Sequence, residues 1–446
     1  MLGLAVWWLT HPPKWIDGAS WAVLMALAWL LFAAGAWLVR KVPKRTAAAL
    51  ILLGGIGLPL AAGFAPPRSS DDLYRYIWDG RVQSAGIDPY RYAPAAPELT
   101  GLRDDFLWPQ QSPWCVVPGG TDREEGLPLA PGCTLINRPS VHTVYPPAAQ
   151  LYFTAVDLLS PDGAKERPVQ LAAALFVAAV TVLLLLAMPR LGIDPRLAAL
   201  WAWCPLVAIE SGNNAHLDVV GAFLTAAALV VLARAKTVRT VAIGGLLLGL
   251  AIATKVTPAL VAPSSLRRRP FVVASAIGAA IAVVYLPHVI AVGPAVLGYL
   301  PGYLNDEGYG SGTRFALLTL IFPPSVAAIA AVFILVVVAI AVWARTDPDR
   351  PWNSAVAMTG TALLLTTPGY SWYAILLVLL IAFSDRIEWL SVALAGYMAQ
   401  YAGNLQLSFT DAQRLGYGIA AAVVTAATLY RMFVVRKIPS PTTALP

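Results

Sequence analysis

Two adjacent carboxylates, Asp71 and Asp72, follow an apolar stretch and open a polar segment, so they are well placed for acid–base chemistry. If this segment is helical, Asp72, Arg75 and Asp79 are spaced three and four residues apart and share one face. A carboxylate there can accept a proton from a hydroxyl, and a nearby guanidinium can bind a phosphate. The simpler alternative is a capped surface helix with exposed ion pairs, because acidic residues are common where helices start.

A second set of polar side chains lies at the ends of apolar segments farther along the chain. Ionisable groups at the edges of membrane spans are unfavourable unless they pair or line a hydrated cavity. For any one residue, a snorkelling or structurally paired role is the simpler interpretation, whereas convergence of the set indicates a site. The set comprises Asn213, Asn214, His216, Asp218, Lys255, Arg314, Tyr370, Trp372 and Tyr373.

Metal and nucleotide chemistry are not indicated by the sequence. Asp71, Asp72, His216 and Asp218 could together hold a divalent cation, but nothing in their spacing requires one, and we assign no metal ligand and no required cofactor. The chain has no phosphate-cradling glycine loop, no Cys and His cluster with metal spacing and no nucleophile elbow.

The composition points to a membrane as the surroundings of these residues. The 446 residues are 58% hydrophobic and only 12% charged, whereas soluble surfaces need about a quarter or more of their residues charged. The net charge of +7 belongs to short basic loops and is interpreted as a topology signal, so no nucleic-acid partner is expected.

Apolar runs of roughly 18 to 24 residues recur along the whole length, each long enough to cross a bilayer as a helix. We therefore expect an all-α polytopic membrane protein, one domain over residues 1–446, with about 12 or 13 crossings. The basic clusters at 40–45, 190–196, 234–239, 267–269, 345–350 and 431–437 are expected in the cytoplasm. This alternation requires a short half-helix at 256–263 and a helix at 148–159 that lies on the membrane surface.

Residues 66–145 then form a long extracytoplasmic loop with short interfacial helices. Cys115 and Cys133 lie in this loop, in an oxidising compartment, and are predicted to form a disulfide, the alternative being two free thiols. Cys204 lies in a predicted span and is expected to be a small buried apolar residue.

Four stretches of the sequence resemble a known family in order and spacing. They are residues 71–81 with 86–90, residues 144–150, residues 214–218 and residues 249–258. They resemble the GT-C superfamily of polytopic glycosyltransferases, and within it the actinobacterial mannosyltransferases that use a polyprenyl-phosphate sugar donor. An extra N-terminal span ahead of the first long loop departs from the family pattern.

The resemblance implies a reaction and assigns roles. An acidic residue of the first outer loop is the catalytic base, which gives this role to Asp71 or Asp72, and Asp71 matches the first acidic position. The donor phosphate would be bound by cations and the sugar by a polar pocket. The substrate-binding candidates are Arg75, Asp79, Arg81, Tyr145, Asn214, His216, Asp218, Lys255, Arg314 and Tyr373.

The implied function is transfer of a sugar, expected to be mannose, from polyprenyl phosphate to a glycolipid or lipid-linked glycan. Transfer would invert the anomeric configuration and occur on the extracytoplasmic face of the plasma membrane, in cell-envelope lipoglycan synthesis. One alternative is a transporter or flippase of lipid-linked sugars, which would need an inverted repeat with broken helices in both halves. Others are a related enzyme using another sugar and a non-catalytic relative.

Overall fold

The computed structural model describes residues 1–13, 17–109 and 134–433 of the chain. Within these ranges the chain forms helices and no strands, which confirms the predicted all-α membrane protein. The N-terminal part contains α1 (Leu2–Thr10), α2 (Gly18–Leu38), α3 (Lys44–Ala62), α4 (Asp72–Ser84) and α5 (Pro147–Leu159). The central part contains α6 (Arg167–Arg190), α7 (Ala199–Ala202), α8 (Asp218–Ala233), α9 (Val238–Thr254), α10 (Ala262–Ser265), α11 (Pro270–Val292) and α12 (Leu300–Asp306). The C-terminal part contains α13 (Pro324–Arg345), α14 (Trp352–Thr366), α15 (Ile375–Ser384), α16 (Leu390–Gln400) and α17 (Phe409–Phe433).

Six helices of the described chain are long and apolar enough to cross a membrane. A seventh span is present if the bent pair formed by 207–213 and α8, which meet at 118°, counts as one. The other predicted spans form shorter helices such as α9, α14, α15 and α16, which accounts for the difference from 12 or 13 crossings. Polar residues and prolines at the ends of these segments terminate the helices early.

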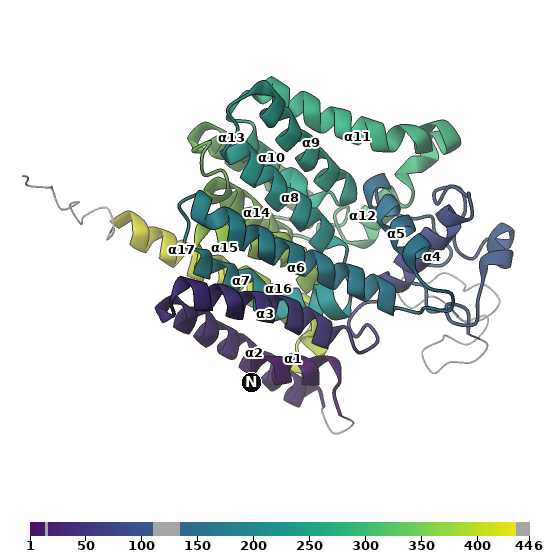
Figure 1. Cartoon of the computed structure of the whole chain (residues 1–446), viewed down its shortest axis with the longest axis horizontal. Helices are drawn as coiled ribbons and strands as arrows, with labels where there is room; N and C mark the ends of the chain where they lie inside the picture. Colours follow the sequence, from purple (N-terminus) through teal and green to yellow (C-terminus); the bar gives the residue numbers. More distant parts are fainter. Residues whose placement is uncertain (14–16, 110–133, 434–446) are drawn as a thin grey trace, which may run out of the picture.

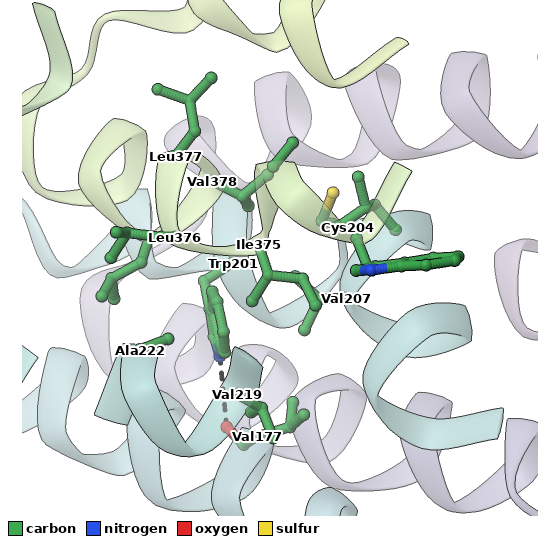
Figure 2. Close-up of a cluster of buried hydrophobic side chains, with 14 of the residues drawn as sticks. Val177, Trp201, Cys204, Val207, Val219, Ala222, Ile375, Leu376, Leu377 and Val378 are labelled. Atoms are coloured by element: carbon green, nitrogen blue, oxygen red, sulfur yellow. Dashed lines mark hydrogen bonds between the residues drawn. The ribbon is translucent and has the colours of Figure 1, made fainter. Parts of the chain in front are cut away.

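The core of the bundle is built around a short helix that is buried on every side. In α15 all residues from Ile375 to Phe383 are buried, which explains why its sequence is uniformly apolar. Trp201 packs beside it and donates its indole N–H to the Val177 carbonyl at 3.2 Å (Figure 2). Cys204 is fully buried in the same cluster, as predicted.

The close contact of α9 with α11 depends on glycine. A side-chain carbon at Gly245 would lie 2.7 Å from the Ala276 methyl group, and one at Gly249 would lie 2.7 Å from Ala280. Small residues spaced four apart allow two membrane helices to approach this closely. The two helices run in the same direction, since residues 255–269 return the chain between them.

Helices α4, α5 and α12 gather at one end of the bundle, beyond the ends of the long helices (Figure 1). Within the described part of the loop at 66–145 lie α4 and a short helix at Pro97–Leu102, which fits the prediction of short helices. With 13 residues, α5 is too short to cross a hydrocarbon core of about 30 Å. Cys115 and Cys133 lie outside the described residues, so their pairing stays a prediction.

Candidate active site

A cavity of about 630 Å³ opens at this end of the bundle and brings together residues distant in sequence. Asp71, Asp72 and Arg75 reach it from the start of α4, Tyr145 from the segment before α5, Lys255 from the end of α9 and Tyr373 from the start of α15. Tyr370 and Trp372 of the predicted set line it as well, so eight predicted residues lie at this cavity. Asp79, Arg81, Asn214, His216, Asp218 and Arg314 lie behind or beside the cavity.

The two aspartates at the start of α4 lie in different surroundings. Asp71 is the exposed residue that precedes the helix. Asp72 is half-buried; its backbone N–H donates to the Ser70 hydroxyl at 3.2 Å, and its carboxylate accepts from the Asn137 side-chain amide at 2.7 Å. Ser70 therefore caps the turn, and Asp72 is held in a fixed orientation at the cavity wall.

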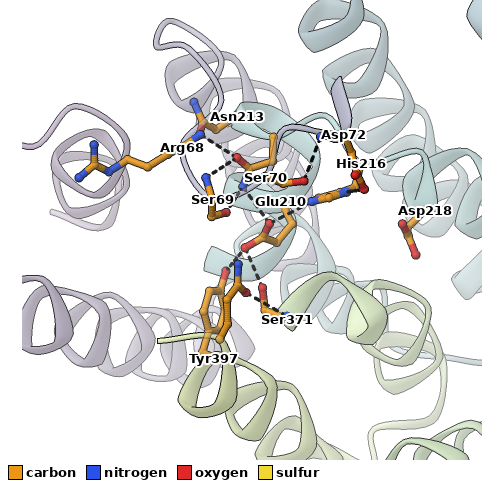
Figure 3. Close-up of polar contacts among 12 residues, drawn as sticks. Arg68, Ser69, Ser70, Asp72, Glu210, Asn213, His216, Asp218, Ser371 and Tyr397 are labelled. Carbon is orange, nitrogen blue, oxygen red and sulfur yellow. Dashed lines mark hydrogen bonds and ion pairs between the residues drawn. The ribbon is translucent and has the colours of Figure 1, made fainter. Parts of the chain in front are cut away.

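His216 lies between two carboxylates, one of them in the cavity wall (Figure 3). Its Nδ1 is 3.7 Å from Asp72 and its Nε2 is 3.6 Å from Glu210, and the imidazole is completely buried. Neither ring nitrogen has a hydrogen-bond partner within the described chain, and the ring stacks on Trp372 with a centroid distance of 4.0 Å. The imidazole is therefore positioned to exchange a proton with either acid after a small movement.

Glu210 is a buried acid that the sequence analysis did not select. Its carboxylate accepts hydrogen bonds from Ser371 at 2.8 Å, Asn214 at 2.8 Å and Tyr397 at 3.1 Å, and is completely buried. It lies in a π-helical turn at Val207–Asn213, a geometry often found at functional sites. In the sequence, Glu210 is a single acid inside an apolar stretch.

Asn213 and Asn214 position the segment that leads into α4. The Asn213 side-chain amide donates to the carbonyls of Ala62, Ala65 and Pro66. The Asn214 side-chain oxygen accepts from the backbone N–H groups of Arg68 and Ser69 at 2.9 and 3.1 Å. Asn214, predicted as a substrate-binding residue, is thus buried and holds the backbone just before the two aspartates.

Arg75 and Asp79 form a buried pair that holds the outer loop against α4. The Arg75 guanidinium donates to Asp79 at 3.0 Å and to the carbonyls of Arg138 and Val141 at 3.1 Å. Asp79 also accepts from Thr143 at 2.6 Å and from Gln150 at 3.1 Å. Although Arg75 lines the cavity, these contacts use much of its donor capacity, which favours a positioning role.

Arg81 lies farther along α4 and pairs with Asp104 at 2.7 Å and with the Leu102 carbonyl. Hydrogen bonds from Arg81 and the backbone keep the pKa of Asp104 below its usual value, although its partial burial acts in the opposite direction. Arg81 therefore stabilises the loop away from the cavity.

Lys255 supplies positive charge at the cavity. Its ammonium group forms an ion pair with the buried Asp218 at the start of α8 and lies 5.3 Å from the centre of the Tyr373 ring. Tyr373 is hydrogen-bonded through its hydroxyl to Tyr303, and Arg314 lies behind its ring at 5.1 Å, paired with Glu307. Arg314 thus supports Tyr373 from outside the cavity.

Tyr145 contributes a neutral hydroxyl to the cavity wall. Burial raises the pKa of its hydroxyl well above the usual value, and the nearby Asp72 carboxylate acts in the same direction. The ring contacts Tyr76 at a centroid distance of 5.0 Å, and the Tyr145 carbonyl accepts from Tyr90 at 2.6 Å. Tyr145 can therefore donate a hydrogen bond to a sugar hydroxyl or a phosphate oxygen.

Part of the cavity lining is apolar. It is formed by side chains of the 257–261 turn and of α12, α13 and α14, including Leu260, Leu304, Leu335 and Leu363. One cavity thus combines carboxylates, a cation and aliphatic side chains in its lining. Among the described residues, no three His, Cys, Asp or Glu side chains are grouped to hold a metal ion.

Comparison with known proteins identifies the family. Residues 143–368, just over half of the chain, match the model of glycosyltransferase family 87. The chain belongs to this family, within the GT-C superfamily. The resemblance named the same superfamily, and the six long apolar helices of the described residues agree with a multi-pass membrane protein.

Two further matches cover shorter parts of the chain. Residues 11–113 match the model of the N-terminal domain of an alpha-(1->6)-mannopyranosyltransferase family. Over 99 residues the chain is 33% identical to a probable alpha-(1->6)-mannopyranosyltransferase of Mycolicibacterium smegmatis, a match that covers 22% of this chain and 16% of that protein. No solved structure matches the chain.

Proposed function

We propose that this protein transfers mannose from a polyprenyl-phosphate donor to a glycolipid or lipid-linked glycan, with inversion at the anomeric carbon. The matched mannosyltransferase N-terminal domain and the similarity to the mycobacterial protein support mannose as the sugar. The basic loops support a plasma-membrane enzyme whose cavity faces outward.

The observation that carries the proposal is the composition of the active-site cavity. A lipid-linked sugar phosphate has an aliphatic chain, an anionic phosphate and a polar sugar. The wall at Leu260, Leu304 and Leu335 suits the chain, Lys255 suits the phosphate, and Asp72 and Tyr145 suit the sugar and acceptor hydroxyls.

In the proposed reaction Asp72 is the base. The acceptor hydroxyl gives its proton to Asp72 as its oxygen forms a bond to the anomeric carbon. The bond from this carbon to the phosphate oxygen breaks, and the phosphate leaves with the electron pair, stabilised by Lys255. The match to the family pattern favoured Asp71, but the contacts with Asn137 and His216 favour Asp72.

His216 and Glu210 act on this base from behind. The imidazole lies within 3.7 Å of both carboxylates and can move the proton away from Asp72 after transfer. Glu210, held by three hydrogen bonds and 3.6 Å from the imidazole, balances the charge of the ring when it is protonated. His216 and Glu210 are thus positioning residues, while Asp72 is the catalytic residue.

Incubation of the purified protein with polyprenyl-phosphate mannose and candidate glycolipid acceptors tests the proposal. Mass spectrometry should detect the mannosylated acceptor, and the product should be absent with Asp72→Asn. Transfer of a different sugar alone would overturn the assignment of mannose, and activity with a nucleotide sugar alone would overturn the donor.

A further inference from the structure

A basic pocket lies at the end of the bundle opposite the active-site cavity. It has a volume of about 480 Å³ and is lined by Ala233, Arg234, Ala235, Lys236, Arg268, Arg269 and Asp349. The two ends are joined by α9, since Lys236 lies just before this helix and Lys255 directly follows it. A helix of 17 residues is about 25 Å long, so the basic pocket is separate from the cavity.

Only part of the positive charge in this pocket is used by the fold. Arg268 donates to the Ala235 carbonyl at 2.7 Å and to Asp349 at 2.6 Å. Arg234 donates to the Arg190 carbonyl at 2.7 Å. Lys236 and Arg269 are exposed, and within the described part of the chain neither forms an ion pair. Two cations are therefore available to an anionic ligand.

The backbone at Arg269 adds a second observation. This residue has φ 50° and ψ 61°, the left-handed conformation, at the point where the chain turns into α11. Glycine adopts this conformation readily, whereas a residue with a side chain is disfavoured there. The turn thus places a guanidinium in the lining of the basic pocket at a position that glycine would occupy without strain.

An apolar groove begins next to the basic pocket and follows the seam between α9 and α11. It has a volume of about 500 Å³ and is lined by Ala242, Leu246, Phe271, Val272, Ser275 and Ala276. Phe271, two residues after Arg269, is 86% exposed. At the nearby end of α13, Arg267 lies over the exposed Trp343 ring at 5.8 Å. An exposed tryptophan beside arginines is typical of the headgroup level of a membrane.

We propose that the basic pocket and the groove together bind one anionic phospholipid of the leaflet opposite the active site. Its phosphate would contact Lys236 and Arg269, and one acyl chain would lie along the groove. Basic pockets between membrane helices on the cytoplasmic side bind anionic headgroups in this way. With four cations and one carboxylate in the pocket, a zwitterionic lipid would be bound more weakly. The proposal does not depend on the reaction.

Native mass spectrometry tests the proposed lipid site. The full chain in detergent is titrated with phosphatidylglycerol or with phosphatidylcholine. The wild-type protein should bind phosphatidylglycerol at least about tenfold more tightly than phosphatidylcholine. The double variant Lys236→Gln, Arg269→Gln should lose most of this preference. The matched control is Lys44→Gln with Arg45→Gln, which removes the same charge from the same membrane face outside the pocket. This control should retain the preference.

Two further arms separate a lipid from a free anion. Leu246→Trp should weaken phosphatidylglycerol binding without a change of charge, because the indole fills the groove. Inorganic phosphate at equal concentration should not displace the lipid. Equal affinity for both lipids, equal loss in the two charge variants, or displacement by inorganic phosphate would overturn the proposal. Mannosyl transfer in detergent should be the same in all these variants, so the two proposals fail independently.

Discussion

Replacing each of the two aspartates in turn gives the sharpest test of the site. Asp72→Asn keeps the size of the side chain and an oxygen that can accept the hydrogen bond from Asn137, so stability should fall by only about 1 kcal/mol. It removes the proton acceptor, and turnover should fall by roughly 10² to 10⁴ with donor binding little changed.

Asp71→Asn is the informative partner of this variant. Asp71 is more exposed, and its side chain forms no capping hydrogen bond with α4. We expect a loss of turnover at least about tenfold smaller than at Asp72. Asp105→Asn, an exposed carboxylate of the same loop that does not line the cavity, is the control and should behave as the parent.

The assay is single-turnover transfer at saturating donor, with thermal unfolding and donor binding measured on the same preparations. Parental turnover in a folded, donor-binding Asp72→Asn protein would refute its role as base. A large loss at Asp71 alone would restore the assignment that the family pattern favoured.

Three other substitutions test the groups that surround the base. Glu210→Gln should lower kcat about tenfold with little change in KM, because the imidazole loses its charged partner, and unchanged kinetics would contradict that role. Lys255→Ala should raise the donor KM at least about tenfold. Adding Asp218→Asn removes the buried unpaired charge, so it should restore stability but not donor affinity. Asp79→Asn should destabilise the protein by about 3 kcal/mol, because Arg75, Thr143 and Gln150 lose a charged partner. The protein that remains folded should keep its kcat. Thermal unfolding measures the first effect, and active-site titration measures the second.

The fold class could be predicted because it follows from composition. A chain with so little charge and so many apolar runs has few alternatives to membrane helices, and basic loops indicate their direction. The number of crossings was harder to predict. Buried helices such as α15 are apolar all round but only 10 residues long, so an apolar run does not by itself indicate a full span.

Part of the site was also visible in the sequence. Asp72 and Lys255 stood out because charged groups beside apolar segments need partners. The roles of Arg75 and Asn214 could not be predicted, because their partners are backbone carbonyls and N–H groups 63 to 146 residues away in the chain. Glu210 was missed because a π-helical turn, which no residue pattern predicts, brings it to the imidazole.

Transfer by purified protein in the presence of polyprenyl-phosphate mannose tests the central claim most directly. With a glycolipid acceptor, the account predicts a mannosylated product of inverted anomeric configuration that forms with the parent and with Asp105→Asn, and falls at least about a hundredfold with Asp72→Asn. Product formed equally well by the Asp72→Asn protein, or formed only from a nucleotide sugar, would contradict it.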